Sequence, residues 1–408
     1  MPNPLPIIAG KLTRLVSHIK GNGSALPGYV VERLSPNFIK FLADLPNGVV
    51  LVSGTNGKTT TTKIITEILR AGDLRVFTND TGSNFVRGII SSALPHMSIT
   101  GKFPYDIAVL ELDEAHAVRF CEQVKPTYSL LLNVARDQLD RFGEIDHTAN
   151  LLNIVAQNTT QAVIINREDP RLMRIQTTHN VYFGLSSELK SQFPSDADQR
   201  DTKSDQPQPD ATILRKIDGK SATYVIDGKA HAIDLRLRGI YNAYNAAGAI
   251  ATIRRVLPSM PVENVLDTLS NIESAYGRGE VITIDGKQVE LFLVKNPSAF
   301  QLSLTSFASN RHDYLIAVND AIADGRDVSW LWDVDFSELP AVIATSGTRA
   351  ADMALRLQYN DIKTGHIESD LNTALRYTLA KAKKPIRIFA TYTAMLELRK
   401  IMKGKSIL

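Results

Sequence analysis

A chain of 408 residues and 44.9 kDa is too long for one comfortable hydrophobic core, so two or three packed units are expected. Hydrophobic residues make up 44% and charged residues 22%, and no apolar run reaches about 18 residues, which argues against membrane spans and wholesale disorder. The 46 basic and 43 acidic residues leave a net charge of only +3, which excludes a nucleic-acid binder held by bulk electrostatics.

The first 45 residues are predicted to form a helical lead-in. Apolar residues from Ile7 to Phe41 recur at roughly helical spacing, with breaks at residues 21–23 and 27–28. The N-terminal residues 1–6 lack a basic stretch followed by a sustained apolar core, so we predict no secretory signal and a cytoplasmic location.

A mainly parallel α/β domain is predicted over residues 46–275. The run from Val49 to Ser53 is apolar and mostly β-branched up to its last residue, as in a strand buried on both faces, and a helical pattern follows from Thr60 to Arg70. Further short apolar runs alternate with helical stretches such as residues 148–156, and they lie at residues 107–112, 128–133 and 162–166.

The second half of this domain contains an insertion. Residues 186–211 are rich in Ser, Asp, Gln, Lys and Pro, so they are predicted to form a loop or a disordered segment. Residues 213–226 and 230–237 then alternate around two Asp-Gly turns, which predicts short antiparallel strands ahead of a helix that begins near Tyr241.

A smaller, Rossmann-like α/β domain is predicted over residues 276–408. Its expected strands are residues 289–294, 314–318, 342–345 and 386–390. The fold class is therefore α/β, with a P-loop ATPase domain followed by this C-terminal domain.

The loop Gly54-Thr55-Asn56-Gly57-Lys58-Thr59 has the elements that a triphosphate requires. Backbone N–H groups at a helix N-terminus bind phosphate oxygens, Lys58 supplies charge to the β- and γ-phosphates, and the Thr59 hydroxyl suits Mg²⁺. The usual P-loop spacing would put its first glycine at position 52, which is valine, so this is a variant. A Gly-rich turn before an ordinary surface helix is the alternative. Because strand, loop, Lys-Thr pair and helix coincide, we favour the interpretation that this loop binds ATP.

This loop resembles that of the Mur ligase superfamily, which also contains folylpolyglutamate synthase. Four further blocks resemble the same superfamily in matching order, at residues 110–115, 133–141, 239–247 and 276–280. The resemblance implies nucleotide contacts from Gly54, Thr55, Asn56, Gly57, Lys58, Thr59, Thr60, Asn245 and Arg278. It also implies that Thr59 and Glu111 hold Mg²⁺. Plainer alternatives are a salt-bridging carboxylate at Glu111 and a helix-terminal polar residue at Asn245.

A closer resemblance is to the MurT subunits of lipid II isoglutaminyl synthase. It is carried by Gln138 where other Mur ligases have histidine, and by residues 82–88, 295–297, 323–333 and 346–353. MurT chains commonly carry a four-cysteine zinc ribbon, whereas this chain has one cysteine, Cys121, and the polar insertion in the ribbon's place. No zinc is therefore expected, and Cys121 is expected to be an ordinary buried thiol.

The MurT resemblance implies an activity and a partner. ATP would phosphorylate the α-carboxylate of D-glutamate in lipid II at the cytoplasmic membrane face, and ammonia would convert the acyl phosphate to D-isoglutamine. Lys58 and Arg278 would neutralise the transferring phosphoryl group. The ammonia would come from a GatD-type glutaminase subunit in a heterodimer. No nucleic-acid partner is expected.

The resemblance further implies that an aspartate of the C-terminal domain completes the partner's Cys-His pair. The Asp-Gly-Arg-Asp motif at 324–327 makes Asp327 the first candidate and Asp324 the second, with Asp320 and Asp333 also open. Alternatively, these aspartates cap the turn before Ser329.

Two other functions stay open. An amino-acid-adding Mur ligase or folylpolyglutamate synthase-like ligase would turn over ATP with free amino acids, whereas an amidating enzyme needs ammonia. A non-catalytic scaffold would bind ATP without product-dependent phosphate release, and the intact Lys58, Thr59 and Arg278 argue against it.

Overall fold

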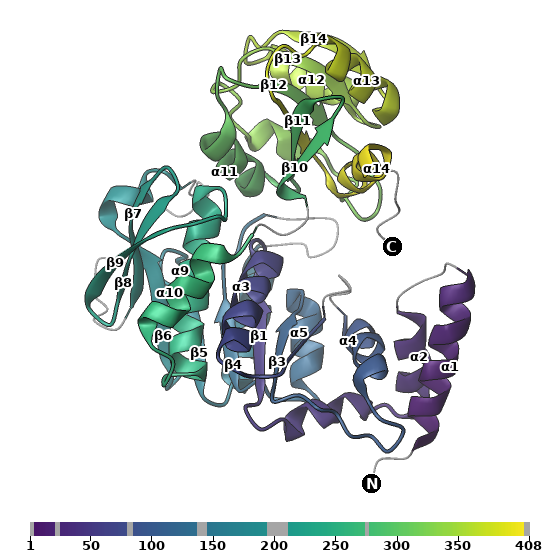
Figure 1. The fold of residues 1–408 in the computed structure, drawn as a ribbon, viewed down its shortest axis with the longest axis vertical. Coiled ribbons are helices and arrows are strands. Elements are labelled where there is room, and N and C mark those ends of the chain that lie inside the picture. The colour runs from purple at the N-terminus through teal and green to yellow at the C-terminus, as the bar shows by residue number, and fades with distance from the viewer. Residues whose placement is uncertain are drawn as a thin grey trace.

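The computed structural model describes residues 4–20, 25–79, 85–136, 145–193, 211–273 and 277–403. The described residues form two sheets, each covered by helices on both faces (Figure 1). The unit that ends in the C-terminal helix lies above the first, with β10 and α11 closest to it. The predicted α/β class is confirmed.

The first sheet has nine strands in the order β2-β3-β1-β4-β5-β6-β7-β8-β9. Its strands pair in parallel from β2 to β7, and β8 and β9 add antiparallel pairs at the far edge. The strands are β1 (Val49–Ser53), β2 (Val76–Thr78), β3 (Ile107–Glu111), β4 (Tyr128–Leu131), β5 (Ala162–Asn166), β6 (Asn180–Leu185), β7 (Thr212–Asp218), β8 (Ser221–Ile226) and β9 (Lys229–Asp234). Every residue of β1 is buried, as expected for a central parallel strand.

Two apolar cores cover the two faces of this sheet. On one face lie α3 (Lys58–Ala71), α9 (Ile240–Val256) and α10 (Val262–Asn271). The other face is covered by α1 (Pro4–Lys20), α2 (Leu26–Leu34), η1 (Phe38–Asp44), α4 (Val86–Ala93), η2 (Leu94–His96), α5 (Glu114–Cys121), α7 (Ile145–Asn158) and η3 (Leu172–Arg174). The helical lead-in therefore shares a core with the sheet, because Ile7, Val31 and Ile39 pack in the same cluster as Val49.

The second sheet has six strands in the order β10-β11-β15-β12-β13-β14. Only β10 is antiparallel to its neighbour. The strands are β10 (Arg278–Ile284), β11 (Lys287–Leu293), β12 (Asp313–Ala317), β13 (Val342–Ser346), β14 (Thr364–Glu368) and β15 (Ile386–Ala390). Helices α11 (Pro297–Phe307), η5 (Ser329–Asp333) and α12 (Ala350–Gln358) cover one face, and α13 (Leu371–Lys381) and α14 (Tyr392–Lys403) cover the other.

Most predicted strands are present within a residue or two of their expected ends, but four were not anticipated. These are β2, β6, β10 and β14. The first residues of the polar insertion form a short helix, α8 (Ser187–Lys190), and its residues 194–210 lie outside the described part. The predicted domain boundary, between residues 275 and 276, falls on residues 274–276, which also lie outside the described part.

None of the described helices is both long enough and apolar enough to cross a bilayer.

Candidate active site

The Gly-rich loop lies between the end of β1 and the start of α3, as the sequence predicted. Gly54 has φ +125° and Gly57 has φ +91°, values that side-chain-bearing residues rarely adopt. A Cβ atom on Gly54 would lie 2.9 Å from the backbone N and O of Asn133, and one on Gly57 would lie 2.6 Å from Oδ1 of Asn245. The two glycines thus allow the loop to pass close to both neighbours.

Asn133, which follows β4, holds this loop in place. Its side chain accepts a hydrogen bond from the Asn56 N–H at 2.9 Å and donates one to the Asn56 carbonyl at 3.0 Å. Its backbone carbonyl accepts from the Thr55 N–H at 3.0 Å. The Thr55 hydroxyl in turn accepts from the Ala135 N–H at 3.0 Å. The sequence placed Asn133 in a family block without giving it this role.

Lys58 is the first residue of α3, and its amine folds back over the loop. Nζ donates to the Gly54 carbonyl at 2.7 Å and lies 3.1 Å from Oδ1 of Asp113. The side chain is largely buried, so its positive charge is held next to the cradle of backbone N–H groups. Asp113 was not predicted as a partner of Lys58. It lies just after β3, beside β1, and parallel strands bring their carboxyl ends to one edge.

Thr59, Glu111 and Arg278 come together from three distant segments. The Thr59 hydroxyl donates to Oε1 of Glu111 at 2.9 Å, and Nη2 of Arg278 donates to the Thr59 hydroxyl oxygen at 3.1 Å. Asn79 fixes the backbone at Glu111, since its amide donates to the Glu111 carbonyl at 2.8 Å and accepts from the Glu111 N–H at 3.0 Å.

These oxygens suit a hard cation. A hydroxyl and a carboxylate are ligands that Mg²⁺ accepts, usually together with water and substrate phosphates. The side chains of Thr59 and Glu111 therefore fit the predicted Mg²⁺, and the guanidinium of Arg278 is placed where phosphate charge would accumulate.

The remaining predicted nucleotide residues also lie at this loop. Asn245 is buried on α9 beside Gly57. Thr60, the third residue of α3, is buried, and its hydroxyl has no hydrogen-bond partner among the described residues.

The C-terminal domain contacts the Gly-rich loop through a pair of asparagine amides. Nδ2 of Asn296 donates to Oδ1 of Asn56 at 3.0 Å, and Nδ2 of Asn56 lies 3.3 Å from Oδ1 of Asn296. Asn296 is only 1% exposed and also caps α11, where its side chain accepts from the Ala299 N–H at 2.8 Å. A second bridge between the domains joins Arg136 to Asp333 at 3.2 Å. The loop and the second domain therefore form one polar site.

Two substitutions at Asn296 separate capping from the inter-domain contact. Asn296→Ala removes both, and losing the cap should destabilise the C-terminal domain by about 1 kcal/mol, a fall of a few degrees in Tm. Asn296→Asp keeps a capping acceptor and the oxygen that faces Nδ2 of Asn56, but it loses the amide that donates to Oδ1 of Asn56. We expect Asn296→Asp to melt near the wild-type temperature while its kcat falls. Equal kcat values for Asn296→Asp and wild type would show that the contact does not matter for turnover.

The two aspartates proposed for the partner's site have different surroundings. Asp324 is 4% exposed, and its carboxylate accepts from the backbone N–H of Thr393 at 2.7 Å and from the Thr393 hydroxyl, at the start of α14. Asp327 is exposed and accepts from the Ser329 N–H at 2.8 Å. Hydrogen bonds from the backbone and the side chain of Ser329 hold the pKa of Asp327 below its usual value. Asp327 thus makes the contact expected of a residue that caps the turn before Ser329, and it also presents an ionised carboxylate at the surface, whereas Asp324 is buried against the start of α14.

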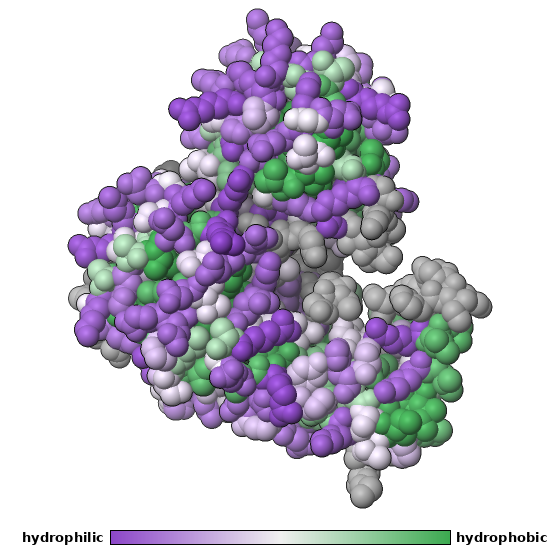
Figure 2. Space-filling view, viewed as in Figure 1, coloured by the Kyte–Doolittle hydropathy of each residue, from purple (hydrophilic) through white to green (hydrophobic). Residues whose placement is uncertain are grey.

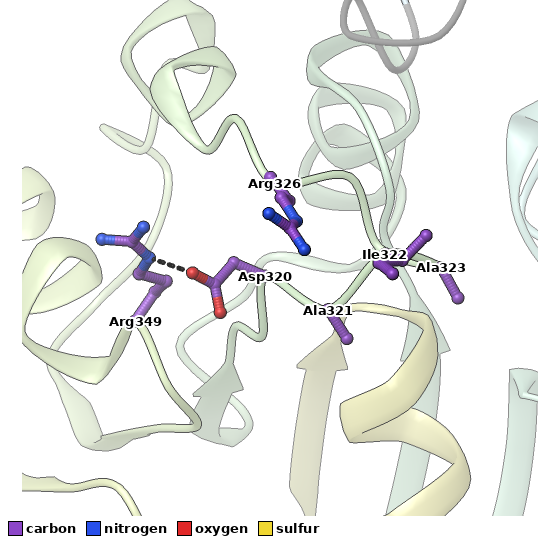
Figure 3. Close-up of a pocket in the computed structure, with 6 residues that line it drawn as sticks. All are labelled: Asp320, Ala321, Ile322, Ala323, Arg326 and Arg349. Atoms are coloured by element: carbon purple, nitrogen blue, oxygen red, sulfur yellow. Dashed lines mark hydrogen bonds and ion pairs between the residues drawn. The ribbon is translucent and has the colours of Figure 1, made fainter.

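A hollow of ≈ 710 Å³ opens next to this motif (Figure 3). Asp320 forms an ion pair with Arg349 at 2.8 Å, and Arg326 extends toward the same carboxylate. A hydrogen bond from the Thr348 hydroxyl and the charge of Arg349 lower the pKa of Asp320. The side chain of Ile322 is well exposed at its margin.

Cys121 is buried at the end of α5, as predicted, and burial raises the pKa of its thiol to about 12. Among the residues that the structure describes, no group of three or more His, Cys, Asp and Glu side chains is arranged to hold a metal ion. We predict that protein purified without chelator contains no stoichiometric zinc, because the chain has one thiol and no paired ligand spacing. Elemental analysis tests this, and one zinc per chain would contradict it.

Comparison with known proteins matches both domains. The Mur ligase middle domain matches residues 52–253, and the MurT ligase C-terminal domain matches residues 293–395. The chain is 30% identical to the lipid II isoglutaminyl synthase (glutamine-hydrolyzing) subunit MurT of Streptococcus pneumoniae, over 99% of this chain and 97% of that protein. It is 30% identical to the Staphylococcus aureus (strain COL) protein of the same name, over 90% of this chain and 91% of that protein.

Solved structures of Mur ligases share the fold. A pseudomurein peptide ligase type C from Methanothermus fervidus aligns with a TM-score of 0.69 at 18% identity, covering 89% of this chain and 79% of that one. MurF ligase from Thermotoga maritima, in complex with ADP, aligns with a TM-score of 0.66 at 17% identity, covering 92% and 85%. The two domain matches and the 30% identity along nearly the whole chain show that the chain belongs to the MurT family of Mur-type ligases.

Proposed function

We propose that this chain is the synthetase subunit of a lipid II isoglutaminyl synthase, which amidates the D-glutamate α-carboxylate of lipid II at the expense of ATP. The observation that carries the proposal is the meeting of Arg278 with Thr59 and Glu111 at the Gly-rich loop. Groups from both domains therefore meet at the loop that we propose to bind phosphate, which supports a ligase that closes on ATP.

The proposed reaction has two steps. The γ-phosphoryl group of ATP passes to the substrate carboxylate, which gives ADP and an acyl phosphate. Ammonia then attacks the carbonyl carbon, and phosphate leaves as the nitrogen loses a proton. Lys58 and Arg278 lower the cost of the charge on the transferring group, and the N–H groups of the Gly-rich loop orient the β- and γ-phosphates. Thr59 and Glu111 would hold Mg²⁺, which shields phosphate charge when it is bound.

Glutamine hydrolysis falls to a separate subunit in this proposal. Cys121, the one thiol of the chain, is buried, and its raised pKa keeps it protonated, so it is unsuited as a glutaminase nucleophile. A GatD-type glutaminase would supply both the nucleophilic cysteine and the ammonia, and a heterodimer would result. Asp327 is the exposed acid best suited to complete that partner's site.

The proposal is tested by incubating lipid II with ATP, Mg²⁺ and this chain, with either an ammonium salt alone or glutamine plus the glutaminase. We expect ADP release together with the small mass decrease that accompanies conversion of an acid into an amide. The matched control is Glu111→Gln, which should lose both products. ATP turnover driven by a free amino acid instead of ammonia would support the amino-acid-adding alternative, and no turnover with any acceptor would support the scaffold.

A further inference from the structure

Helix α1 has a packed face and an exposed apolar face. On its packed face Ile7 is fully buried, and a Cβ atom on Gly10 would lie 2.4 Å from a methyl carbon of Val31 on α2. The opposite face carries five large apolar side chains that are 40–61% exposed. Leu5 is the first of them, and we call the other four the α1 stripe: Ile8, Leu12, Leu15 and Val16.

The spacing of the α1 stripe is i, i+4, i+7 and i+8, which places the four side chains in one sector of an α-helix. Contiguous apolar patches on a protein surface usually mark a contact with another molecule. Figure 2 shows hydrophobic surface gathered over α1 at the lower right. The inward face of α1 joins the core through Ile7, and among the described residues the four side chains of the α1 stripe lie outside that core cluster.

The charges on α1 are of one sign. Its 17 residues contain no Asp or Glu, and they include Lys11, Arg14 and Lys20. Lys11 neighbours Ile8 and Leu15 on the helix surface, at i−3 and i+4. Nζ of Lys11 contacts the backbone carbonyl of Met97, which holds this side chain at the border between the packed face and the exposed one. Arg14 lies on the packed side, at i+7 from Ile7 and i+4 from Gly10, and its Nη1 contacts the carbonyl of Ser91.

An apolar stripe on a helix that carries basic but no acidic side chains matches the surface of an anionic bilayer. Acyl chains accept the apolar side chains, and anionic headgroups attract the lysine and arginine charges. A second copy of the same face would instead bring basic side chains against each other. The basic residues within the helix exclude a spanning arrangement, since such charges are costly at the bilayer centre.

We propose that α1 is a membrane-surface anchor that lies in the plane of an anionic phospholipid bilayer, with the α1 stripe inserted and Lys11 at headgroup level. The helix lies at the outer end of the first domain, away from the C-terminal domain (Figure 1). Docking through α1 therefore leaves the C-terminal domain with its hollow and the exposed Asp327 open to a partner.

The test uses the full chain and vesicles that contain no lipid II, so its outcome is independent of the proposed amidation. Co-sedimentation is measured with phosphatidylglycerol–phosphatidylcholine vesicles and with phosphatidylcholine alone. We expect binding to the anionic vesicles that weakens as salt is raised, and much weaker binding to the neutral ones.

The key variant is Leu12→Ser/Leu15→Ser, with Leu355→Ser/Ile367→Ser as its matched control. The control removes two similarly exposed apolar side chains from the C-terminal domain, on α12 and β14. We expect the α1 variant to lose vesicle affinity by about tenfold or more, because two inserted leucines are gone. The control variant should bind as wild type, and both should keep the wild-type Tm and ATP turnover.

Three outcomes would overturn the proposal. One is wild-type vesicle binding by Leu12→Ser/Leu15→Ser, and another is absence of binding by the unmodified chain. The third is a concentration-dependent dimer, or a complex with the glutaminase, that the α1 variant loses while vesicle binding is absent. That result would assign the α1 stripe to a protein interface.

Discussion

Lys58→Ala is expected to abolish ATP turnover while leaving the fold intact. The amine lies against the Gly54 carbonyl and beside Asp113, so its charge is already fixed at the site before nucleotide arrives. Removing a preorganised charge from a phosphoryl-transfer site costs on the order of 10²- to 10³-fold or more in kcat. Phosphate release with lipid II and an ammonium salt measures the loss.

The control for this variant is Lys63→Ala on the same helix. Nζ of Lys63 contacts the carbonyl of Glu273, away from the loop, so its removal should leave kcat close to wild type. A circular dichroism spectrum and Tm near wild type would show that Lys58→Ala is folded. Wild-type rates in a folded Lys58→Ala protein would contradict the assignment of the Gly-rich loop as the ATP site.

Asp113, which faces Lys58, allows a milder test of the same site. Asp113→Asn leaves Lys58 its contact with Gly54 but removes the facing negative charge. If the carboxylate holds the amine in position, kcat should fall by less than in Lys58→Ala, and raising the ATP concentration should not restore it.

Local patterns in the sequence predicted the Gly-rich loop correctly because all its determinants are contiguous. A buried strand, two glycines at positive φ and a helix beginning at Lys58 follow one another within 23 residues. The meeting of Thr59, Glu111 and Arg278 was expected only through the family resemblance, since the three residues lie up to 219 positions apart.

The contacts that hold the Gly-rich loop and Lys58 in place could not be predicted from the sequence. Three residues contact the Gly-rich loop or Lys58: Asn133, Asp113 and Asn296. Each contact depends on which strand end or which domain lies next to the loop in the folded protein. No periodicity or motif spacing encodes such neighbours. A polar residue just past the end of a central parallel strand was the one usable sign, and Asp113 and Asn133 each lie two positions after such a strand.

The four strands that were missed share a physical cause. Three of them lack a long apolar run: β2 has three residues, β10 has only two buried residues among its seven, and β14 is half-exposed at the sheet edge. The fourth, β6, contains Asn180 and Gly184, which interrupt its pattern. Pairing with a neighbouring strand, and not local propensity, determines such elements.

A division of labour between subunits makes Asp327→Asn the sharpest test of the C-terminal domain. If the Asp327 carboxylate orients and stabilises the histidine of a glutaminase, an amide at this position cannot stabilise the imidazolium, and glutamine-dependent amidation should fall by about 10²- to 10⁴-fold. The hydrogen bond from Ser329 lowers the pKa of Asp327, so the carboxylate is charged at neutral pH and its effect should persist until the pH falls through that lowered pKa.

Ammonium-dependent amidation by Asp327→Asn should match wild type, because Lys58, Thr59, Glu111 and Arg278 are untouched. Asp335→Asn is a matched control, since the Asp335 carboxylate likewise accepts a hydrogen bond from the backbone N–H two residues on. Asp324→Asn should instead lower Tm, because the Asp324 carboxylate is buried against the start of α14.

If ammonium salt fails to rescue Asp327→Asn, the acid serves the synthetase site. If glutamine-dependent activity is unchanged, Asp327 is structural. Glutamine-dependent and ammonium-dependent amidation should then be compared for Asp320→Asn, because Asp320 lines the neighbouring hollow.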